Sequence, residues 1–410
     1  MKYTNEIIRV SVAVALTAGA LPVFAGGFAI GTQSGSGTGN AFAGGAAVAE
    51  DASVVWSNPA GMTALPSGKH VTGALHLVRP SFKFNNTTST LAAAPGTANG
   101  GDGGDWAFIP NGFFAMDISP TLRFGIAFNA PFGLTSEYDT GWRGQLTALK
   151  SELKTININP SLAYKVNDSF SIGGGLNIQR IEAELTSGAN AAGTNIFTLA
   201  ADDIGYGFNV GAILQPSSST RIGAHYRSSI KYKLDGSATF SLIPALNGPV
   251  TADLKTPDTV SLSFLHQATP KLDVMGDVSW TQWSNLQQLV VVRTSGATLT
   301  TLQFRWDDAW RFGVGANYKL SDQTKLRFGV AYDRTPTNDV YRTPRLPDQN
   351  KTWVAFGVQY KPSRQGVLEV GYAHEFVRNA SVNTATAAGN LVGYFKNKAD
   401  ILSIQYAHSF

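Results

Sequence analysis

The chain ends on Leu402-Ser403-Ile404-Gln405-Tyr406-Ala407-His408-Ser409-Phe410, where apolar and polar residues alternate up to the final residue. Because successive side chains of a β-strand point to opposite faces, this stretch predicts a strand with one apolar and one polar face. The same alternation recurs from residue 69 onward, for example in Ala309–Leu320 and Lys325–Asp333. Its recurrence along the whole chain predicts an all-β fold, a transmembrane β-barrel with lipid outside and a polar interior.

Turn sequences allow the strands to be counted. Tight turns are expected at Ser119-Pro120, Asn167-Asp168, Pro216–Thr220, Thr269-Pro270, Ser321-Asp322 and Pro362–Gln365. Longer connections are expected near residues 85–105, 133–152, 187–200, 237–252, 286–300, 337–350 and 379–390. Six turns alternating with seven longer loops predict fourteen antiparallel strands, with the short turns facing the periplasm. The alternative class is a soluble β-sandwich or β-helix.

Residues 1–25 have the features of a secretory signal peptide. Lys2 and Arg9 precede an apolar run, Val10–Leu21, and Val23-Phe24-Ala25 favours cleavage after Ala25. The run is shorter than the roughly 20 residues that a spanning helix needs, which disfavours an uncleaved anchor. Export of a barrel predicts a location in the bacterial outer membrane.

Composition agrees with an exported barrel. Charged residues make up 15% of the chain, against roughly 25% in soluble domains. The net charge of +4 comes without a basic run, so we expect no nucleic-acid partner. The chain contains no cysteine, which excludes disulfides and thiol chemistry.

Residues 26–68 do not alternate. They are rich in glycine, yet Phe28 and Trp56 are too apolar for a free tail, which is the alternative interpretation. We therefore expect them to fold back into the lumen as a plug, or hatch. The predicted organisation is a signal peptide at 1–25, a hatch at 26–68 and a barrel at 69–410.

Several motifs resemble those of the FadL-type long-chain fatty acid and hydrocarbon transporters. They are Gly26-Gly27-Phe28, Ala49-Glu50-Asp51-Ala52, Asn58-Pro59-Ala60, Trp142-Arg143-Gly144-Gln145, Asn157–Tyr164, Lys255–Thr259, Trp280-Thr281-Gln282-Trp283-Ser284 and Leu346–Trp353. The resemblance covers essentially the whole mature chain and implies a monomeric fourteen-stranded barrel with an N-terminal hatch. It also implies passive uptake: ligand adsorbs among the outer loops, enters an apolar pocket and leaves sideways at a kinked strand.

Site residues follow from this resemblance. Phe28 is the first candidate for ligand contact, because the mature N-terminus of the family reaches the pocket. Trp142 and Arg143 suit the tail and carboxylate of an amphipathic acid, although Arg143 facing lipopolysaccharide phosphates stays an alternative. Asn58, Pro59 and Ala60 are expected to fix the hatch to the barrel wall.

The third strand is expected to carry the kink. Its run Phe124–Gly133 contains Gly125, Asn129, Pro131 and Gly133, and proline removes a donor from the hydrogen-bond ladder. The alternative is that Pro131 ends the strand at the outer rim.

Other functions are less consistent with the sequence. An outer-membrane hydrolase is one alternative. The six histidines lie on different predicted strands, and no G-x-S-x-G, Walker or H-E-x-x-H motif or zinc-ligand spacing occurs, so we expect no enzyme, cofactor or metal. A general or polar-solute porin is the main alternative; the predicted plug argues against it. The expected partners are a hydrophobic small molecule, outer-membrane lipid and lipopolysaccharide. The choice between a fatty acid and an aromatic or aliphatic hydrocarbon stays open.

Overall fold

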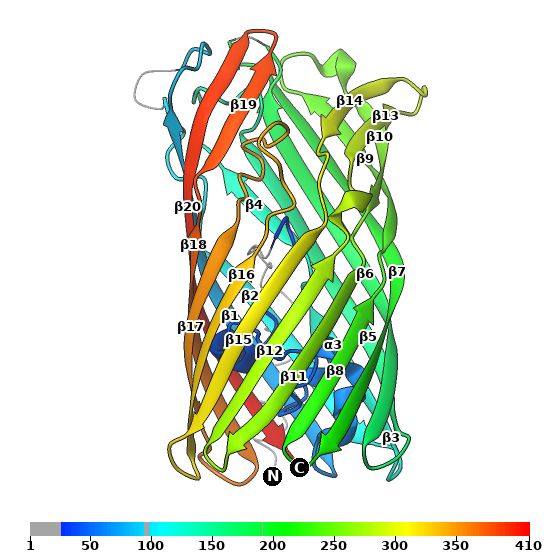
Figure 1. Ribbon diagram of the computed structural model, residues 1–410. Coiled ribbons are helices and arrows are strands. Elements are labelled where there is room, and N and C mark those ends of the chain that lie inside the picture. The colour runs from blue at the N-terminus through cyan, green and yellow to red at the C-terminus, as the bar shows by residue number, and fades with distance from the viewer. Residues whose placement is uncertain (1–25, 94–97, 191) are drawn as a thin grey trace, which may run out of the picture.

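The computed structural model describes residues 26–93, 98–190 and 192–410, whose strands form one closed antiparallel barrel (Figure 1). β1 (Lys69–Asn86) pairs with β2 (Ala107–Asp117) on one side and with β20 (Gly389–Ser409) on the other, which leaves the sheet without a free edge. The predicted signal peptide, residues 1–25, lies outside the described residues.

Over the described residues the barrel has fourteen strand positions, as predicted. Eight positions hold one unbroken strand: β1, β2, β20, β5 (Lys150–Lys165), β6 (Phe170–Gly188), β7 (Ile196–Ser217), β16 (Thr324–Asp333) and β17 (Lys351–Tyr360). Six hold a strand in two pieces: β3 (Leu122–Asn129) with β4 (Gly133–Glu137), β8 (Thr220–Arg227) with β9 (Lys231–Phe240), β11 (Thr259–Thr269) with β10 (Gly248–Lys255), β12 (Leu272–Thr281) with β13 (Gln288–Arg293), β15 (Ala309–Lys319) with β14 (Thr298–Gln303), and β18 (Gly366–Val377) with β19 (Ala380–Thr386).

The alternation of the last strand sorts its side chains as predicted. Leu402, Ile404 and Tyr406 on β20 are 40%, 44% and 49% exposed and form part of the outer apolar face. Ser403 and Gln405 are buried on the inner face. The register of β20 on β1, with Leu75 opposite Ile404, continues this outer face onto the next strand.

The six predicted turns all join consecutive strands at one end of the barrel, where the C-terminus also lies (Figure 1). Four longer connections are shorter than predicted, because β7, β9, β10, β13, β14, β19 and β20 continue as paired hairpins into the ranges 187–200, 237–252, 286–300 and 379–390. Each of these ranges contains two or three threonines, and this β-branched residue favours strands.

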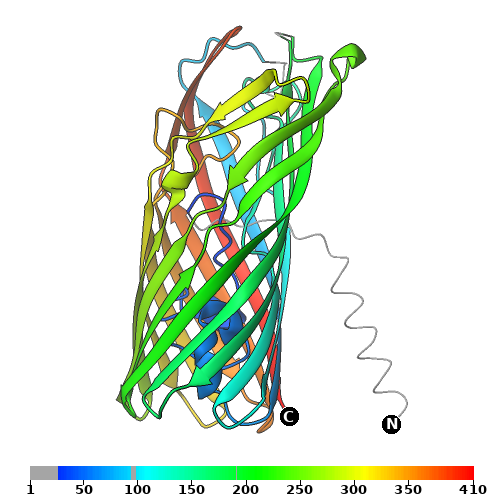
Figure 2. The same cartoon turned by 90° about the vertical axis from the view of Figure 1, so that its right-hand side faces the viewer.

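The N-terminal segment, residues 26–65, lies within the ring of strands (Figure 2). It contains α2 (Gly35–Gly39), α3 (Val54–Ser57) and the 3₁₀ turn η1 (Pro59–Ala64). Two further 3₁₀ turns, η2 (Pro244–Leu246) and η3 (Trp283–Asn285), lie in breaks and loops of the barrel. In the part of the chain that the structure describes, no helix has the length and apolar character needed to cross a membrane.

Candidate ligand-binding site

An apolar cavity, which we call the upper cavity, is lined in part by residues of β4, β9, β10, β13 and β14. These strand pieces lie toward the end of the barrel away from the short turns (Figure 1). The volume of the cavity is about 80 Å³. The apolar side chains that line it are Phe28, Leu134, Leu153, Leu185, Leu234, Leu254, Leu286, Leu289, Leu302, Phe304, Trp306 and Leu346. A wall of this kind favours an apolar ligand, and a few polar groups at its rim would orient it.

Phe28 is at the centre of an aromatic cluster at the base of this cavity. Its ring centroid lies 4.7 Å from that of Trp283, 5.6 Å from that of Trp306 and 5.8 Å from that of Phe132. Phe28 is 5% exposed, so the rings close over it. Edge-to-face contacts of this kind hold the ring in a defined orientation without a polar bond.

The two residues before Phe28 are tethered by carboxylates. The Gly26 backbone N–H donates to Asp333 Oδ2 at 3.1 Å, and the Gly27 N–H donates to Asp348 Oδ2 at 3.0 Å. Gly27 has φ +69°, and a Cβ there would lie 2.8 Å from the Trp283 ring. Only glycine can lie this close to the Trp283 ring without strain.

A buried guanidinium lies at the cavity wall. Arg345 is 9% exposed, and its Nη1 donates to the Lys150 carbonyl at 3.2 Å and to Ser151 Oγ at 3.1 Å. No described carboxylate forms an ion pair with it, and burial lowers the pKa of Arg345 to about 10. Arg342, on the same loop, is instead paired with Asp339 at 2.5 Å. Arg345 is therefore a cation without a counter-charge beside an apolar cavity.

The third strand breaks where the sequence places Pro131. β3 ends at Asn129 and the strand resumes as β4 at Gly133. The N-terminal segment fills the break: Ile30 N–H donates to the Pro131 carbonyl and Gly133 N–H to the Phe28 carbonyl, each at 2.8 Å. The strand continues beyond Pro131, which therefore does not end it at the outer rim.

Beside this break the wall lacks part of its ladder. The β2–β3 register runs from Gly112 to Asp117, and among the described residues Ala107–Asn111 pair only with β1. Polar side chains of the N-terminal segment bridge the interval: the Gln33 amide donates to the Ala130 carbonyl at 3.1 Å, and Asn129 donates to Gln33 Oε1 at 2.6 Å. Side-chain amides thus replace main-chain pairing here, and they can exchange partners without unfolding a strand.

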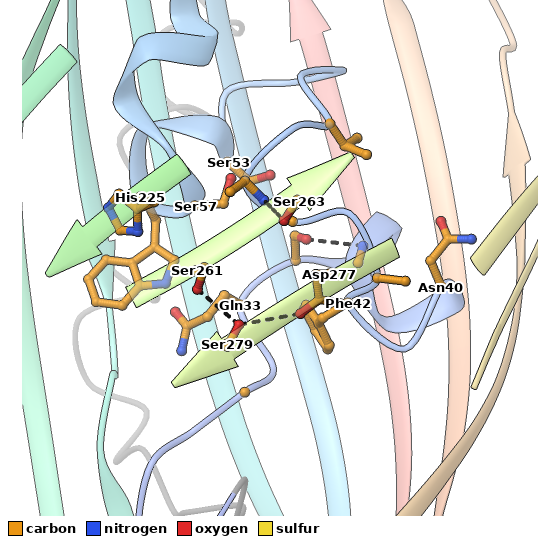
Figure 3. Close-up of a pocket in the computed structure, with 18 of the residues that line it drawn as sticks. Gln33, Asn40, Phe42, Ser53, Ser57, His225, Ser261, Ser263, Asp277 and Ser279 are labelled. Atoms are coloured by element: carbon orange, nitrogen blue, oxygen red, sulfur yellow. Dashed lines mark hydrogen bonds between the residues drawn. The ribbon is translucent and has the colours of Figure 1, made fainter. Parts of the chain in front are cut away.

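A second cavity, the lower cavity, has a volume of about 290 Å³ and separates part of the N-terminal segment from β8, β11, β12 and β15 (Figure 3). Its barrel side is polar. Ser261 and Ser279 share a hydrogen bond of 2.9 Å, Ser279 donates to Asp277 at 3.3 Å, and Asp277 is paired with Arg311 at 3.4 Å. These groups favour water over an alkyl chain.

Asn58 fixes the N-terminal segment to the barrel wall. Its Nδ2 donates to the Ala46 carbonyl at 2.7 Å and to the carbonyls of Ala212 on β7 and Ala224 on β8 at 3.1 and 3.3 Å. Its Oδ1 accepts from the Ala60 N–H at 3.2 Å, which caps the turn that Pro59 begins. One fully buried amide therefore serves both the fold of the segment and its attachment.

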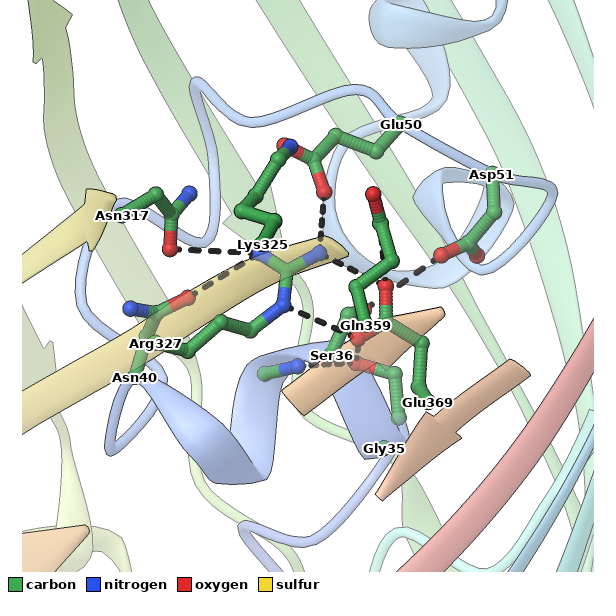
Figure 4. A network of polar contacts seen from close by, with 12 residues as sticks. Gly35, Ser36, Asn40, Glu50, Asp51, Asn317, Lys325, Arg327, Gln359 and Glu369 are labelled. Carbon is green, nitrogen blue, oxygen red and sulfur yellow. Dashed lines mark hydrogen bonds and ion pairs between the residues drawn. The ribbon is translucent and has the colours of Figure 1, made fainter. Parts of the chain in front are cut away.

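An ion network attaches the same segment to the opposite wall (Figure 4). Arg327 on β16 bonds both oxygens of Glu369 on β18, at 3.0 and 2.6 Å, and also lies 2.5 Å from Glu50. Lys325 reaches the other Glu50 oxygen at 2.8 Å. Burial alone raises the pKa of Glu50, but Arg327 and Lys325 outweigh it and hold that pKa well below its usual range.

A profile of the family described as "Outer membrane protein transport protein (OMPP1/FadL/TodX)" matches residues 16–410. The chain belongs to this family. It is an outer-membrane transport protein and not an enzyme, as the sequence predicted.

Known proteins match this chain over almost its full length. A long-chain fatty acid transport protein of Escherichia coli O6:H1 is 25% identical and covers 100% of this chain and 99% of its own. The crystal structure of a Pseudomonas aeruginosa FadL homologue has a TM-score of 0.86, 26% identity and coverage of 94% and 100%. The Ralstonia pickettii toluene transporter TbuX shares the fold, with a TM-score of 0.68, 20% identity and coverage of 92% and 98%.

The structure separates the residues that the sequence singled out. Phe28 lines the upper cavity, whereas Trp142 is fully buried against Tyr138, with ring centroids 4.5 Å apart, and lines neither cavity. Arg143 donates to the Leu91 carbonyl and also lies away from both cavities. Gly125 lies against the N-terminal segment, since a Cβ there would be 2.5 Å from Met62 Sδ. Ligand contact at Trp142 and Arg143 stays a prediction.

Some residues of the upper cavity, and Trp283 of the aromatic cluster at its base, were not predicted. Trp283 and Leu346 fall inside motifs that carried the family resemblance, and Arg345 directly precedes one of them, but none was assigned a role. The motifs were the available signal. No cluster of three or more potential metal ligands occurs in the described part of the chain.

Proposed function

We propose that this protein takes up long-chain fatty acids passively across the outer membrane. The observation that carries the proposal is Arg345, a buried guanidinium without a carboxylate partner beside a leucine-lined cavity. A fatty acid offers both groups that this site lacks: a carboxylate for the guanidinium and an alkyl chain for the leucines. The E. coli relative named as a long-chain fatty acid transport protein supports the same ligand class.

A monoaromatic hydrocarbon is the second candidate. The upper cavity, about 80 Å³, is smaller than the roughly 150 Å³ cavity that accepts benzene in a protein core, and aromatic rings close its base. For either ligand the Phe28 ring has to move, because the volume alone accommodates neither. A hydrocarbon would leave Arg345 without a role.

The proposed route has three stages. Ligand is captured among the outer loops, occupies the upper cavity and leaves sideways at the break between β3 and β4. The missing β2–β3 pairing at Ala107–Asn111 and the exchangeable amides of Gln33 and Asn129 support this exit. The hydroxyls and the Asp277–Arg311 pair of the lower cavity argue against a route downward for an apolar molecule.

We propose that residues 26–68 act as the plug of this barrel and that the mature chain begins at Gly26. Around the tether, Asp333, Asp348 and Glu375 are buried with one lysine, Lys351, which is paired with Asp348 at 2.8 Å. Cleavage after Ala25 would convert the Gly26 N–H into an ammonium 3.1 Å from Asp333 and supply a second positive charge. The protein is expected to act as a monomer in contact with outer-membrane lipid and lipopolysaccharide.

Intrinsic tryptophan fluorescence tests the ligand, because Trp283 and Trp306 border the cavity that it would enter. The refolded protein is titrated with oleate, oleyl alcohol, toluene and an n-alkane. Oleate is expected to bind more tightly than oleyl alcohol, and Arg345→Met should lower oleate affinity about tenfold, consistent with the loss of a charge-assisted hydrogen bond.

The alcohol and Arg143→Ala are the controls. Loss of oleyl alcohol binding in Arg345→Met would mean that the loop has collapsed rather than that a charge was lost. A drop in oleate affinity confined to Arg143→Ala would move the carboxylate site to the second outer loop. Toluene binding without oleate binding would establish the hydrocarbon candidate, and passage of small sugars through the barrel would identify a porin.

A further inference from the structure

On the outer face of β1, β20 and β18, apolar side chains give way to charged ones between two successive cross-strand pairs. Leu77 on β1 lies opposite Leu402 on β20, and the next outward-facing pair is Arg79 opposite Asp400. These strands are neighbours on the left of Figure 1. Because the apolar band marks the depth of the hydrocarbon core, Arg79 and Asp400 mark the headgroup level of the outer leaflet.

Three lysines lie directly beyond this level. Lys83 on β1 is opposite Lys396 on β20, and Lys398, two residues from Lys396, is opposite Ser81. All three are exposed, with 64% of the Lys83 side chain and 59% of the Lys398 side chain accessible. Like charges directly opposite on adjacent strands repel each other and destabilise the pairing.

Local carboxylates neutralise these lysines only in part. Asp102 is 3.9 Å from Lys83 and is shared with Arg79 at 4.0 Å. Asp400 is 3.9 Å from Lys398 but is bonded at 2.7 Å to both His374 and Tyr372. Lys396 has no ion pair with any carboxylate in the described chain. The surface therefore retains positive charge that an outside anion can neutralise.

The wall on β5, β6 and β7 provides a comparison. Directly beyond its apolar residues, Lys150 and Lys154 bond Glu152 at 3.0 and 2.5 Å, and Arg180 bonds Asp202 at 3.2 Å. With Glu182 and Glu184, which also pair with Arg180 and Lys150, carboxylates outnumber cations there. On this wall, unlike that of β1 and β20, each of these cations has a carboxylate partner within 3.2 Å.

We propose that this sector binds a phosphorylated glycolipid of the outer leaflet, the lipid A part of lipopolysaccharide. Its phosphates neutralise Lys83, Lys396 and Lys398, while its acyl chains lie along Leu75, Leu77 and Ile404 below them. Both parts are needed: a free phosphate would leave the apolar band unused, and an uncharged lipid would leave the excess positive charge of this surface without an anion. The inference does not depend on which ligand the barrel transports.

The test compares lipid retention by the full-length protein and the triple variant Lys83→Gln/Lys396→Gln/Lys398→Gln. Native mass spectrometry after detergent extraction should detect lipid A on the wild type, and titration with purified lipid A should show roughly hundredfold weaker binding in the variant, at about fivefold per lysine near an anionic surface. The control is Lys165→Gln/Lys319→Gln, which removes two exposed lysines beside the short turns at the other end of the barrel. It should bind lipid A as the wild type does.

Further ligands test whether lipid A, another anionic lipid or free phosphate supplies the anion. Dephosphorylated lipid A and inorganic phosphate should both bind at least tenfold more weakly than lipid A. Equal binding of phosphatidylglycerol, or equal loss of lipid A in the control variant, would overturn the proposal in favour of a general charge effect. Heat-modifiable electrophoretic migration reports folding; a folded triple variant that keeps full lipid A affinity would also overturn it.

Discussion

The N-terminal segment is held to the barrel in two different ways. Residues 35–65 are attached by buried charges and amides, through Glu50 with Arg327 and through Asn58 with two strands. Gly26 and Gly27 are tethered by Asp333 and Asp348, but residues 28–33 are held by aromatic rings and by hydrogen bonds to the broken third strand. Breaking the first set leaves charges unpaired in the interior, whereas an apolar ligand can replace the ring contacts of the second. We infer that a ligand can displace Phe28 and the residues that follow it, while residues 35–65 stay attached to the barrel.

Arg327→Met should have the largest effect, a loss in the free energy of unfolding. It leaves Glu369 and Glu50 without their cation, and Glu369 is 2% exposed, so the loss in unfolding free energy should be about 3–5 kcal/mol. The measurement is urea unfolding of the refolded barrel. Lys325→Met is the control, because its pair with Glu50 is partly exposed and should be worth about 1 kcal/mol or less. Equal losses in the two variants would contradict the assigned role of Arg327.

Asn58→Ala should rank second. It removes a buried amide that bonds three carbonyls, at an expected cost of about 1–3 kcal/mol. Hydrogen exchange should show faster opening of residues 35–65 while the barrel strands remain protected. Asn383→Ala on β19 changes an exposed asparagine and should leave exchange in this segment unaltered.

Gly27→Ala acts next to Phe28 and should affect ligand more than fold. A methyl group would lie 2.8 Å from Trp283 on a backbone with φ +69°, and the strain of about 1–2 kcal/mol should weaken ligand binding roughly tenfold. Gly296→Ala is the matched control, since Gly296 also has a positive φ, +84°, but open space around it. If both variants bind ligand normally, the position of Phe28 does not depend on the close contact between Gly27 and Trp283.

Mild acid should give the smallest change in residues 35–65, through protonation of Glu50. The pKa of Glu50 is held below its usual value of 4.5, so its stabilising contribution is complete above pH 4.5 and is lost as pH falls below that value. Hydrogen exchange of residues 35–65, corrected for intrinsic rates, should rise as pH falls from 4.5 to about 3. Glu50→Gln should abolish this pH dependence; a dependence that survives would assign it to another carboxylate.

The strands and turns could be predicted because they depend on local pattern. In Leu402–Ala407 each residue's exposure follows from its parity, and each tight turn carries residues that favour turns wherever they occur. The outer hairpins were predicted less well. Residues 187–200 and 237–252 look like loops in composition, yet β7, β9 and β10 pair there, because pairing depends on the partner strand as well as on the residue.

Only part of the candidate site could be predicted from the sequence. Phe28 and the break at Pro131 were predicted, the first through a family motif and the second through the missing proline N–H. Arg345 was not, because what distinguishes it is the absence of a carboxylate near it, and that absence depends on segments distant in sequence.

By itself the sequence determined a fourteen-stranded barrel, its inner and outer faces and the apolar character of its N-terminal segment, since each depends on the order of residues along the chain. The tertiary structure alone decided that Trp283, Trp306 and Phe132 meet at Phe28, that Arg345 is unpaired, and that Lys83 faces Lys396. These are contacts between segments up to several hundred residues apart. Charge balance and cavity shape arise only when such segments come together.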